Sequence, residues 1–164
     1  MTDPIPERIA AVIVTRLQAI TTVNGYAFTV ADVIRPDRQA RAYTPKNNLI
    51  LVEQGDSVPV PELDIPGNPP AIAEILTFQI YGINRVGDRE ATAKSIGDNT
   101  LEACIKKAIV AGTTAWYHFS NLALNAAFGV TQPFASQAGD HAGIMVPLSI
   151  TYRYSELDPY TVRR

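Results

Sequence analysis

Residues 144–154, Ile144-Met145-Val146-Pro147-Leu148-Ser149-Ile150-Thr151-Tyr152-Arg153-Tyr154, decide the fold of this chain. Aliphatic or aromatic side chains occupy every second position from Ile144 onward, which places them on one face of an extended strand. The stretch therefore predicts a long strand with one buried face. A polar tail, residues 155–164, follows at once. It is too short to fold alone, so we expect it to lie on a neighbouring subunit or partner.

The first third of the chain predicts one helix and two strands. Apolar side chains recur at helical spacing through residues 5–22, which is typical of an amphipathic helix. Alternation predicts a strand from Tyr26 to Ile34 and a second strand over 48–53. Gln54-Gly55-Asp56 has the composition of a turn that ends this second strand.

The rest of the chain predicts a central strand and a second helix. Residues 71–84 carry apolar side chains on both faces, as expected of a strand inside a sheet. A helix rich in small residues should run from about 88 to 110, and its Cys104 should be a core thiol. Alternation favours another strand over 122–128, and 131–143 has the composition of a loop.

These elements predict one α+β domain spanning residues 1–164. We expect a mixed or antiparallel sheet with the two main helices packed on one face. The loop over residues 55–70 is rich in proline, with five of the chain's twelve prolines between 59 and 70. Such a segment is stiff and extended, and it could be a crossover between strands or an arm that grips a partner.

Composition excludes several classes of protein. A net charge of −2 argues against a dedicated DNA-binding protein, because such proteins need a broad basic surface. The apolar runs are too short to span a bilayer, so no membrane partner is expected. The N-terminus lacks the basic and apolar regions of a secretory signal, which predicts synthesis and retention in a cytoplasm. A single cysteine excludes a disulfide within the chain.

No residue pattern predicts catalysis, a metal or a cofactor. His118 and His141 are in neither an H-E-x-x-H nor a C-x-x-C context, and the chain has no nucleotide-binding glycine motif. Ser136, Asp140 and His141 are the residue types of a hydrolytic triad, but no G-x-S-x-G motif accompanies them. We therefore expect a protein that is not an enzyme, with no catalytic, cofactor-binding or metal site.

The order of these elements resembles the tail terminator, or tail completion, proteins of long-tailed bacteriophages. The likeness rests on the N-terminal amphipathic helix, a strand pair with a turn at Glu53-Gln54-Gly55-Asp56, the long strand followed by a helix of about 20 residues, and the later motifs. These motifs are Trp116, Gln132-Pro133-Phe134, Tyr152-Arg153-Tyr154 and Asp158-Pro159. It spans nearly the whole chain.

The resemblance implies a virion protein, made in the host cytoplasm and located at the top of the tail. It would form a homohexameric ring that caps the tail tube, ends tube polymerisation and offers a docking surface to a neck or head-tail connector protein. Genomic DNA would pass through the lumen without sequence-specific contacts. The alternative is another head-tail connector or neck subunit.

Two sets of residues are candidates for contacts in such a ring. Cations outnumber acids between residues 35 and 46, where only Asp37 opposes four basic side chains, so we expect this segment to face the lumen or rim. Its basic residues are Arg35, Arg38, Arg41 and Lys46. The expected contacts with a neighbouring subunit or partner lie in the C-terminal tail: Asp158, Pro159, Tyr160 and Val162.

Overall fold

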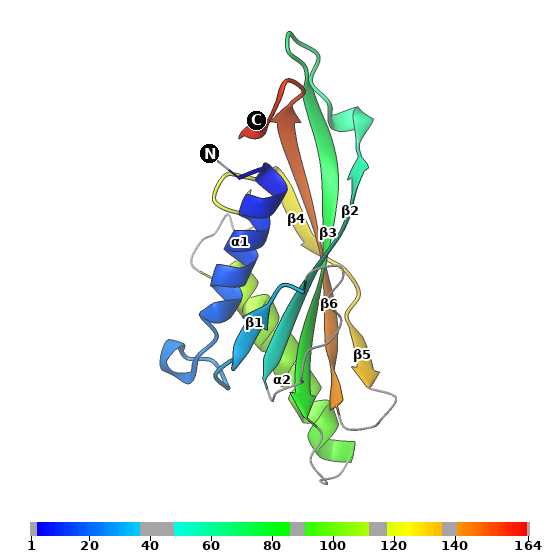
Figure 1. The fold of residues 1–164 in the computed structure, drawn as a ribbon. Helices are drawn as coiled ribbons and strands as arrows, with labels where there is room; N and C mark the ends of the chain where they lie inside the picture. Colours follow the sequence, from blue (N-terminus) through cyan, green and yellow to red (C-terminus); the bar gives the residue numbers. More distant parts are fainter. Residues whose placement is uncertain (1–2, 37–47, 86–90, 112–117, 136–140, 164) are drawn as a thin grey trace.

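The computed structural model describes residues 3–36, 48–85, 91–111, 118–135 and 141–163. This part of the chain forms an α+β fold with one mixed sheet of seven strands and two α-helices (Figure 1). The helices are α1 (Ile5–Gln18) and α2 (Ala91–Val110). The expected fold class is therefore confirmed at the level of a single-sheet α+β protein.

Two long antiparallel strands, β3 (Ala71–Arg85) and β6 (His141–Ser155), form the centre of the sheet. Their register is continuous from Ala71 opposite Ser155 to Arg85 opposite His141. The strand β2 (Leu49–Pro59) pairs antiparallel with the other edge of β3. The three-residue strand β1 (Asp32–Ile34) then pairs parallel with the beginning of β2.

Three short strands follow one another along the remaining edge of β6. They are β7 (Asp158–Val162), β4 (Asn125–Phe128) and β5 (Gln132–Ala135), and all three are antiparallel to β6. The two central strands therefore extend the whole length of an elongated molecule, while shorter strands share its edges (Figure 1).

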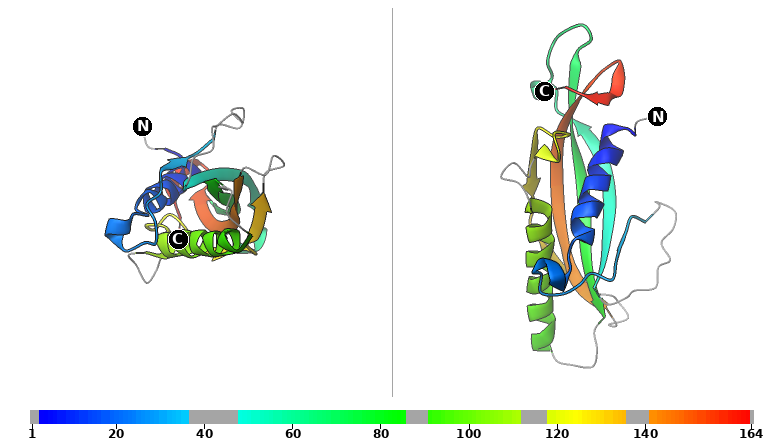
Figure 2. Two further views of the ribbon diagram at one scale, coloured as in Figure 1. Left: turned by 90° about the horizontal axis from the view of Figure 1, so that it is seen from below. Right: turned by 90° about the vertical axis from the view of Figure 1, so that its left-hand side faces the viewer.

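Both helices pack against the same face of the sheet (Figure 2). The predicted alternation of β6 is confirmed, because Val146, Leu148 and Ile150 are fully buried in the core that the helices cover. Gly82 of β3 lies under α2, and a Cβ atom there would be 3.0 Å from the Ile105 side chain. The close approach of helix and sheet needs a small residue at this position. Cys104 is buried in the same core, as predicted.

The opposite face of the sheet has a smaller apolar cluster. Leu49, Leu51 and Ile83 are buried there, and the partly buried rings of Tyr81 and Phe134 meet edge to face with centroids 5.7 Å apart. Two apolar faces on one strand are what the sequence of 71–84 predicts, and β3 is indeed central.

The predicted elements of the first third need three corrections. The first helix ends at Gln18 rather than near residue 22, and only Asp32–Ile34 of the expected strand 26–34 is a strand. Gln54-Gly55-Asp56 is not a turn, because β2 continues to Pro59 and contains a register shift between Gln54 and Ser57. A Cβ on Gly55 would lie 2.5 Å from Thr77 Oγ1. Gly55 therefore lies in a β-bulge that is close to the next strand. Glycine is common in bulges as well as in turns, which explains why a turn was predicted.

The C-terminal half needs two corrections. Residues 131–143 are not one loop, because they contain β5 and the beginning of β6. The strand predicted over 122–128 begins only at Asn125, after left-handed backbone at Phe119, Ser120 and Asn121. The segment expected to start α2 near Asp88 lies outside the described residues.

Candidate functional site

The features relevant to function concentrate at one end of the sheet, which we call the hairpin end and define as residues 56–74 and 153–163. It contains the proline-rich connection from β2 to β3 and the connection from β6 to β7 (Figure 1). The first connection includes the short 3-10 helix η2 (Pro61–Leu63).

The proline-rich connection is bonded to its own sheet. Asp64 Oδ1 accepts a hydrogen bond from the Ala73 amide at 2.7 Å, and Ile65 and Ala71 exchange two backbone bonds. Val60, Ala71 and Ala73 are buried as a result. Within the chain the segment is therefore a connection between the adjacent antiparallel strands β2 and β3 rather than a crossover, and the interpretation as an arm that grips a partner stays a prediction.

The two connections are also bonded to each other. The Glu156 amide donates to the Pro70 carbonyl at 3.1 Å. Arg153 Nη2 donates to the Leu63 carbonyl at 2.5 Å. One backbone bond and one side-chain bond therefore join the two connections.

A carboxylate lies between two tyrosines on the side of the sheet that faces the helices. Glu74 accepts hydrogen bonds from Tyr152 Oη at 2.5 Å and from Tyr154 Oη at 2.9 Å. Burial, followed by the bond to Glu74, raises the pKa of Tyr154 to about 12 and raises that of Tyr152 as well. Both phenols therefore stay neutral donors near neutral pH, and we interpret the network as a structural one. The alternation of residues 144–154 predicts both tyrosines on one face, but no local pattern predicts that Glu74 joins them.

The C-terminal tail folds back on its own chain. Residues 158–162 form β7, and Tyr154 pairs with Val162 while Ser155 pairs with Asp158. In addition, Arg8 Nη1 of α1 donates to the Tyr160 carbonyl at 3.2 Å. In the single chain the tail thus completes an edge of its own sheet, and the expected contact of this tail with a neighbouring subunit or partner stays a prediction.

The four predicted contact residues of this tail divide into two groups. Val162 packs against the main core, and Asp158 accepts bonds from the Tyr160 amide and the Thr161 hydroxyl. These bonds, first that from Thr161, lower the pKa of Asp158. Pro159 and Tyr160 are exposed and could meet a neighbour.

The predicted lumen residue Arg35 is engaged within the chain. Its guanidinium donates two hydrogen bonds to the carboxylate of Glu7 on α1, and a third to Gln54 Oε1 at 3.3 Å. Such a bidentate pair fixes the guanidinium and neutralises its charge locally. The pair reduces the positive charge that Arg35 could offer to a lumen, and the position of Arg35 in a ring stays a prediction. Arg38, Arg41 and Lys46 lie outside the described residues.

The hairpin end exposes apolar side chains that the sequence reasoning did not single out. They are Val58 near the end of β2, Leu63 and Ile65 in the β2–β3 connection, and Leu157 in the β6–β7 connection, which is 77% exposed. One feature of the sequence could have identified them. Large aliphatic residues occur there in a proline-rich segment and a turn, where small polar residues are more usual.

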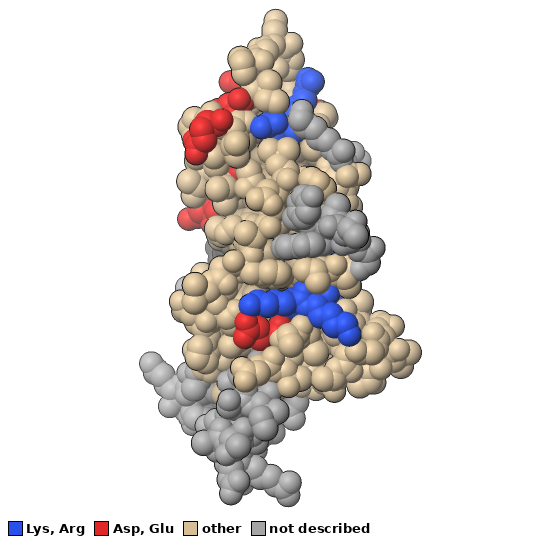
Figure 3. Space-filling view, turned by 180° about the vertical axis from the view of Figure 1, so that it is seen from behind, with Lys and Arg blue, Asp and Glu red and all other residues tan. Residues whose placement is uncertain are grey.

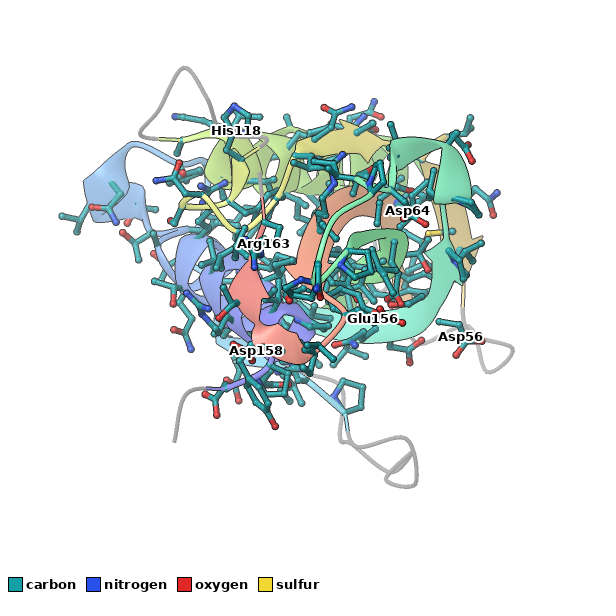
Figure 4. The ribbon with its side chains drawn as sticks, turned by 90° about the horizontal axis from the view of Figure 1, so that it is seen from above. Asp56, Asp64, His118, Glu156, Asp158 and Arg163 are labelled. Carbon is teal, nitrogen blue, oxygen red and sulfur yellow. The ribbon has the colours of Figure 1, made fainter. Side chains whose placement is uncertain are left out.

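Acidic residues outnumber basic ones in the segments of the hairpin end. Segments 56–74 and 153–163 contain six acidic and two basic residues, a net charge of −4. Figure 4 looks down on this end and shows Asp64, Glu156, Asp158 and Asp56 distributed across it, with Arg163 among them. From the side of α2, acidic side chains gather on one flank near this end, and basic ones lie beside them (Figure 3).

The described residues offer no grouping for metal chemistry. No cluster of three or more His, Cys, Asp or Glu side chains suited to a metal ion occurs among them. His118 Nδ1 lies 3.2 Å from the Ala123 carbonyl, while Ser136 and Asp140 of the considered triad lie outside the described residues. No helix in the described part of the chain is long and apolar enough to cross a membrane.

No protein-family model matches the sequence, and no curated protein is significantly similar to it.

Proposed function

We propose that this protein is a structural component of a long-tailed bacteriophage particle, which forms a hexameric ring on the tail tube. The ring would stop tube polymerisation and provide the docking surface for the head. In this proposal the protein is not an enzyme, and its partners are other copies of itself, the tube protein and a neck or head-tail connector protein.

The observation that carries the proposal is the arrangement of one sheet, two helices on one face and a C-terminal strand with an exposed outer side. The element order agrees with the resemblance to tail terminator proteins. In β7, Val162 anchors the strand to its own core while Pro159 and Tyr160 remain exposed. A ring needs such heterologous surfaces, in which one part of a subunit meets a different part of the next.

The proposed lumen now depends on Arg38, Arg41 and Lys46, because Arg35 pairs with Glu7. Repetition of these three cations around a ring would give a positive band that attracts passing DNA without reading its sequence.

The oligomeric state tests the proposal. Light scattering over a range of protein concentrations should show assembly towards a hexamer, because small interfaces respond to concentration by mass action. Adding the protein to polymerising tube subunits should also stop tube elongation. A closed dimer as the sole species, with no effect on tube length, would contradict the proposal.

A further inference from the structure

We infer that β7 is an exchangeable strand, which in an assembly leaves the edge of its own β6 and occupies the same edge of β6 in a second copy of this chain. Each subunit would give one strand and receive one, so the contact runs head to tail and can close a ring. The inference rests on the proposed function in one respect, since it takes the exchanging copies to be neighbours in the proposed ring.

The connection between β6 and β7 is unfavourable for a tight hairpin. It consists of two residues, Glu156 and Leu157. Two-residue hairpins favour turns in which one or both central residues have a positive φ, and glycine, asparagine or aspartate usually occupy these positions. Neither Glu156 nor Leu157 has a positive φ, and the side chain of Leu157 is largely exposed. The chain therefore turns here without the residues that best hold a hairpin closed.

The pairing of β7 with β6 is correspondingly incomplete. In the described structure Asp158 lies opposite Ser155 and Val162 lies opposite Tyr154, with a register shift between the two pairs. The residues between them, 159–161, are exposed and have no register partner on β6. The long strand β3, by contrast, pairs with β6 in one unbroken register along its whole length. Fewer contacts therefore break when β7 leaves β6 than when a regularly paired strand does.

The remaining contacts of β7 are ones that a second copy could supply unchanged. Val162 packs against the main core, and the Arg163 amide donates to the Arg153 carbonyl at 3.1 Å. Arg8 Nη1 on α1 donates to the Tyr160 carbonyl. Every copy of the chain carries these partners on α1, on β6 and in the core. An exchanged strand regains the contacts that it loses, so exchange has only to open a two-residue connection and bring two copies together.

The length of the vacated edge also fits β7. The strands β4 and β5 pair with the same edge of β6 between Ala142 and Thr151, so only the end of β6 beyond them would become free. A short strand with an apolar anchor near its end matches this site, and β7 of another copy has both features. A second copy of this chain is therefore the occupant.

Disulfide trapping tests the inference. In Ser155→Cys with Asp158→Cys the two cysteines lie opposite each other, within one chain if β7 stays at home and between two chains if it is exchanged. Oxidation at a concentration where light scattering shows assembly should give covalent multimers on a non-reducing gel. Oxidation of the dilute monomer should instead form the bond within the chain, and this protein should not assemble on concentration until it is reduced.

The matched control is Thr77→Cys with Ser149→Cys, a pair that lies opposite in the β3–β6 ladder. Its disulfide should stay within one chain under all conditions and leave assembly as in wild type. Cys104 is buried and is common to both variants, so it does not distinguish them. Thermal unfolding of the reduced variants shows that they are folded before the comparison is made.

A second pair of variants changes the connection and needs no disulfide. Glu156→Asn with Leu157→Gly supplies the dipeptide that best suits a two-residue hairpin, so it should hold β7 at home and weaken assembly at least about tenfold in light scattering. Leu157→Ser removes the same exposed side chain without favouring a positive φ, and it should assemble like wild type. Equal assembly of the Asn-Gly variant and wild type would overturn the inference.

The outcomes separate strand exchange from the proposed ring. Hexamers in which the Ser155→Cys, Asp158→Cys variant forms bonds only within a chain would overturn the exchange and leave the ring intact. Covalent dimers without hexamers would support the exchange and contradict the ring. Monomers of wild-type protein at every concentration would contradict both.

Discussion

The two ends of the long β3–β6 ladder are built differently. Towards the Ile83–Gly143 end, apolar side chains cover both faces of the sheet and the α2 helix lies close against it. At the hairpin end, Glu74 and two tyrosines form a polar network, and aliphatic side chains and carboxylates face solvent. Tight packing at one end suits stability, while the exposed groups at the other suit contacts with other proteins.

The largest effect should come from filling space at the tightly packed end. In Gly143→Ala the new Cβ would lie 2.0 Å from the Gly82 carbonyl oxygen, so the central strands must separate. We expect a loss of about 3 kcal/mol in the free energy of unfolding, measured by urea denaturation. Gly67→Ala is the matched change at the hairpin end, where the nearest atom is 3.4 Å away, and it should cost less than about 0.5 kcal/mol. Equal losses in the two variants would remove the distinction between the ends.

The next effect concerns the polar network. Tyr152→Phe removes a donor to Glu74 and leaves a half-buried carboxylate with one tyrosine partner fewer. Loss of a hydrogen bond to a charged group should cost about 2 kcal/mol of unfolding free energy. Tyr160→Phe, at an exposed ring, is the control and should be nearly neutral. If both substitutions are neutral in urea denaturation, the network contributes nothing to stability.

The same network predicts a loss of stability at high pH. An unfolded tyrosine titrates near pH 10, whereas the pKa of Tyr154 in the folded chain is about 12. The folded chain holds this proton more tightly, so its contribution is complete below about pH 10 and is lost as pH rises towards 12. Melting temperatures measured from pH 9 to 12 should fall less steeply in Tyr154→Phe than in wild type. Parallel profiles would show that Tyr154 does not contribute to this pH dependence.

A pair of changes in β7 separates folding from assembly. Val162→Ser should lower the unfolding free energy by about 1 kcal/mol, because Val162 packs against the main core. Tyr160→Ser should leave stability unchanged and weaken the hexamer about tenfold, measured by light scattering. If the Tyr160→Ser variant forms a hexamer as stable as that of wild type, the Tyr160 side chain is not part of the intersubunit contact.

The smallest effect should come from Arg35. Its pair with Glu7 is partly exposed, so Arg35→Ser should cost less than about 1 kcal/mol. It should also leave DNA retention in assembled particles unchanged, whereas Arg38→Ser with Arg41→Ser should alter it. A defect in DNA retention with Arg35→Ser alone would show that Arg35 contributes to the lumen despite its pair with Glu7.

The sequence predicts the elements whose side chains repeat regularly. The alternation of residues 144–154 and the apolar stripe of α1 correspond to long buried surfaces, so periodicity finds them. It fails at Gly55, where the same residue type fits a turn or a bulge, and at β5, which is four residues long and contains Pro133. Short edge strands are set by the strand beside them rather than by their own sequence.

The candidate contacts were harder to predict because they depend on pairing between distant residues. Nothing near Arg35 in the sequence indicates Glu7, which is 28 positions away, and nothing in residues 155–164 shows that the tail returns to β6. The sequence indicated Tyr160 as a candidate contact residue, and its side chain is exposed, but the contact itself stays a prediction.

Electron microscopy of intact virus particles, averaged around the tail axis, tests the proposed ring most directly. We predict six copies of this fold in one ring between the end of the tail tube and the neck. Density for this fold at the baseplate, or a ring of different symmetry at the head-tail junction, would contradict the proposal.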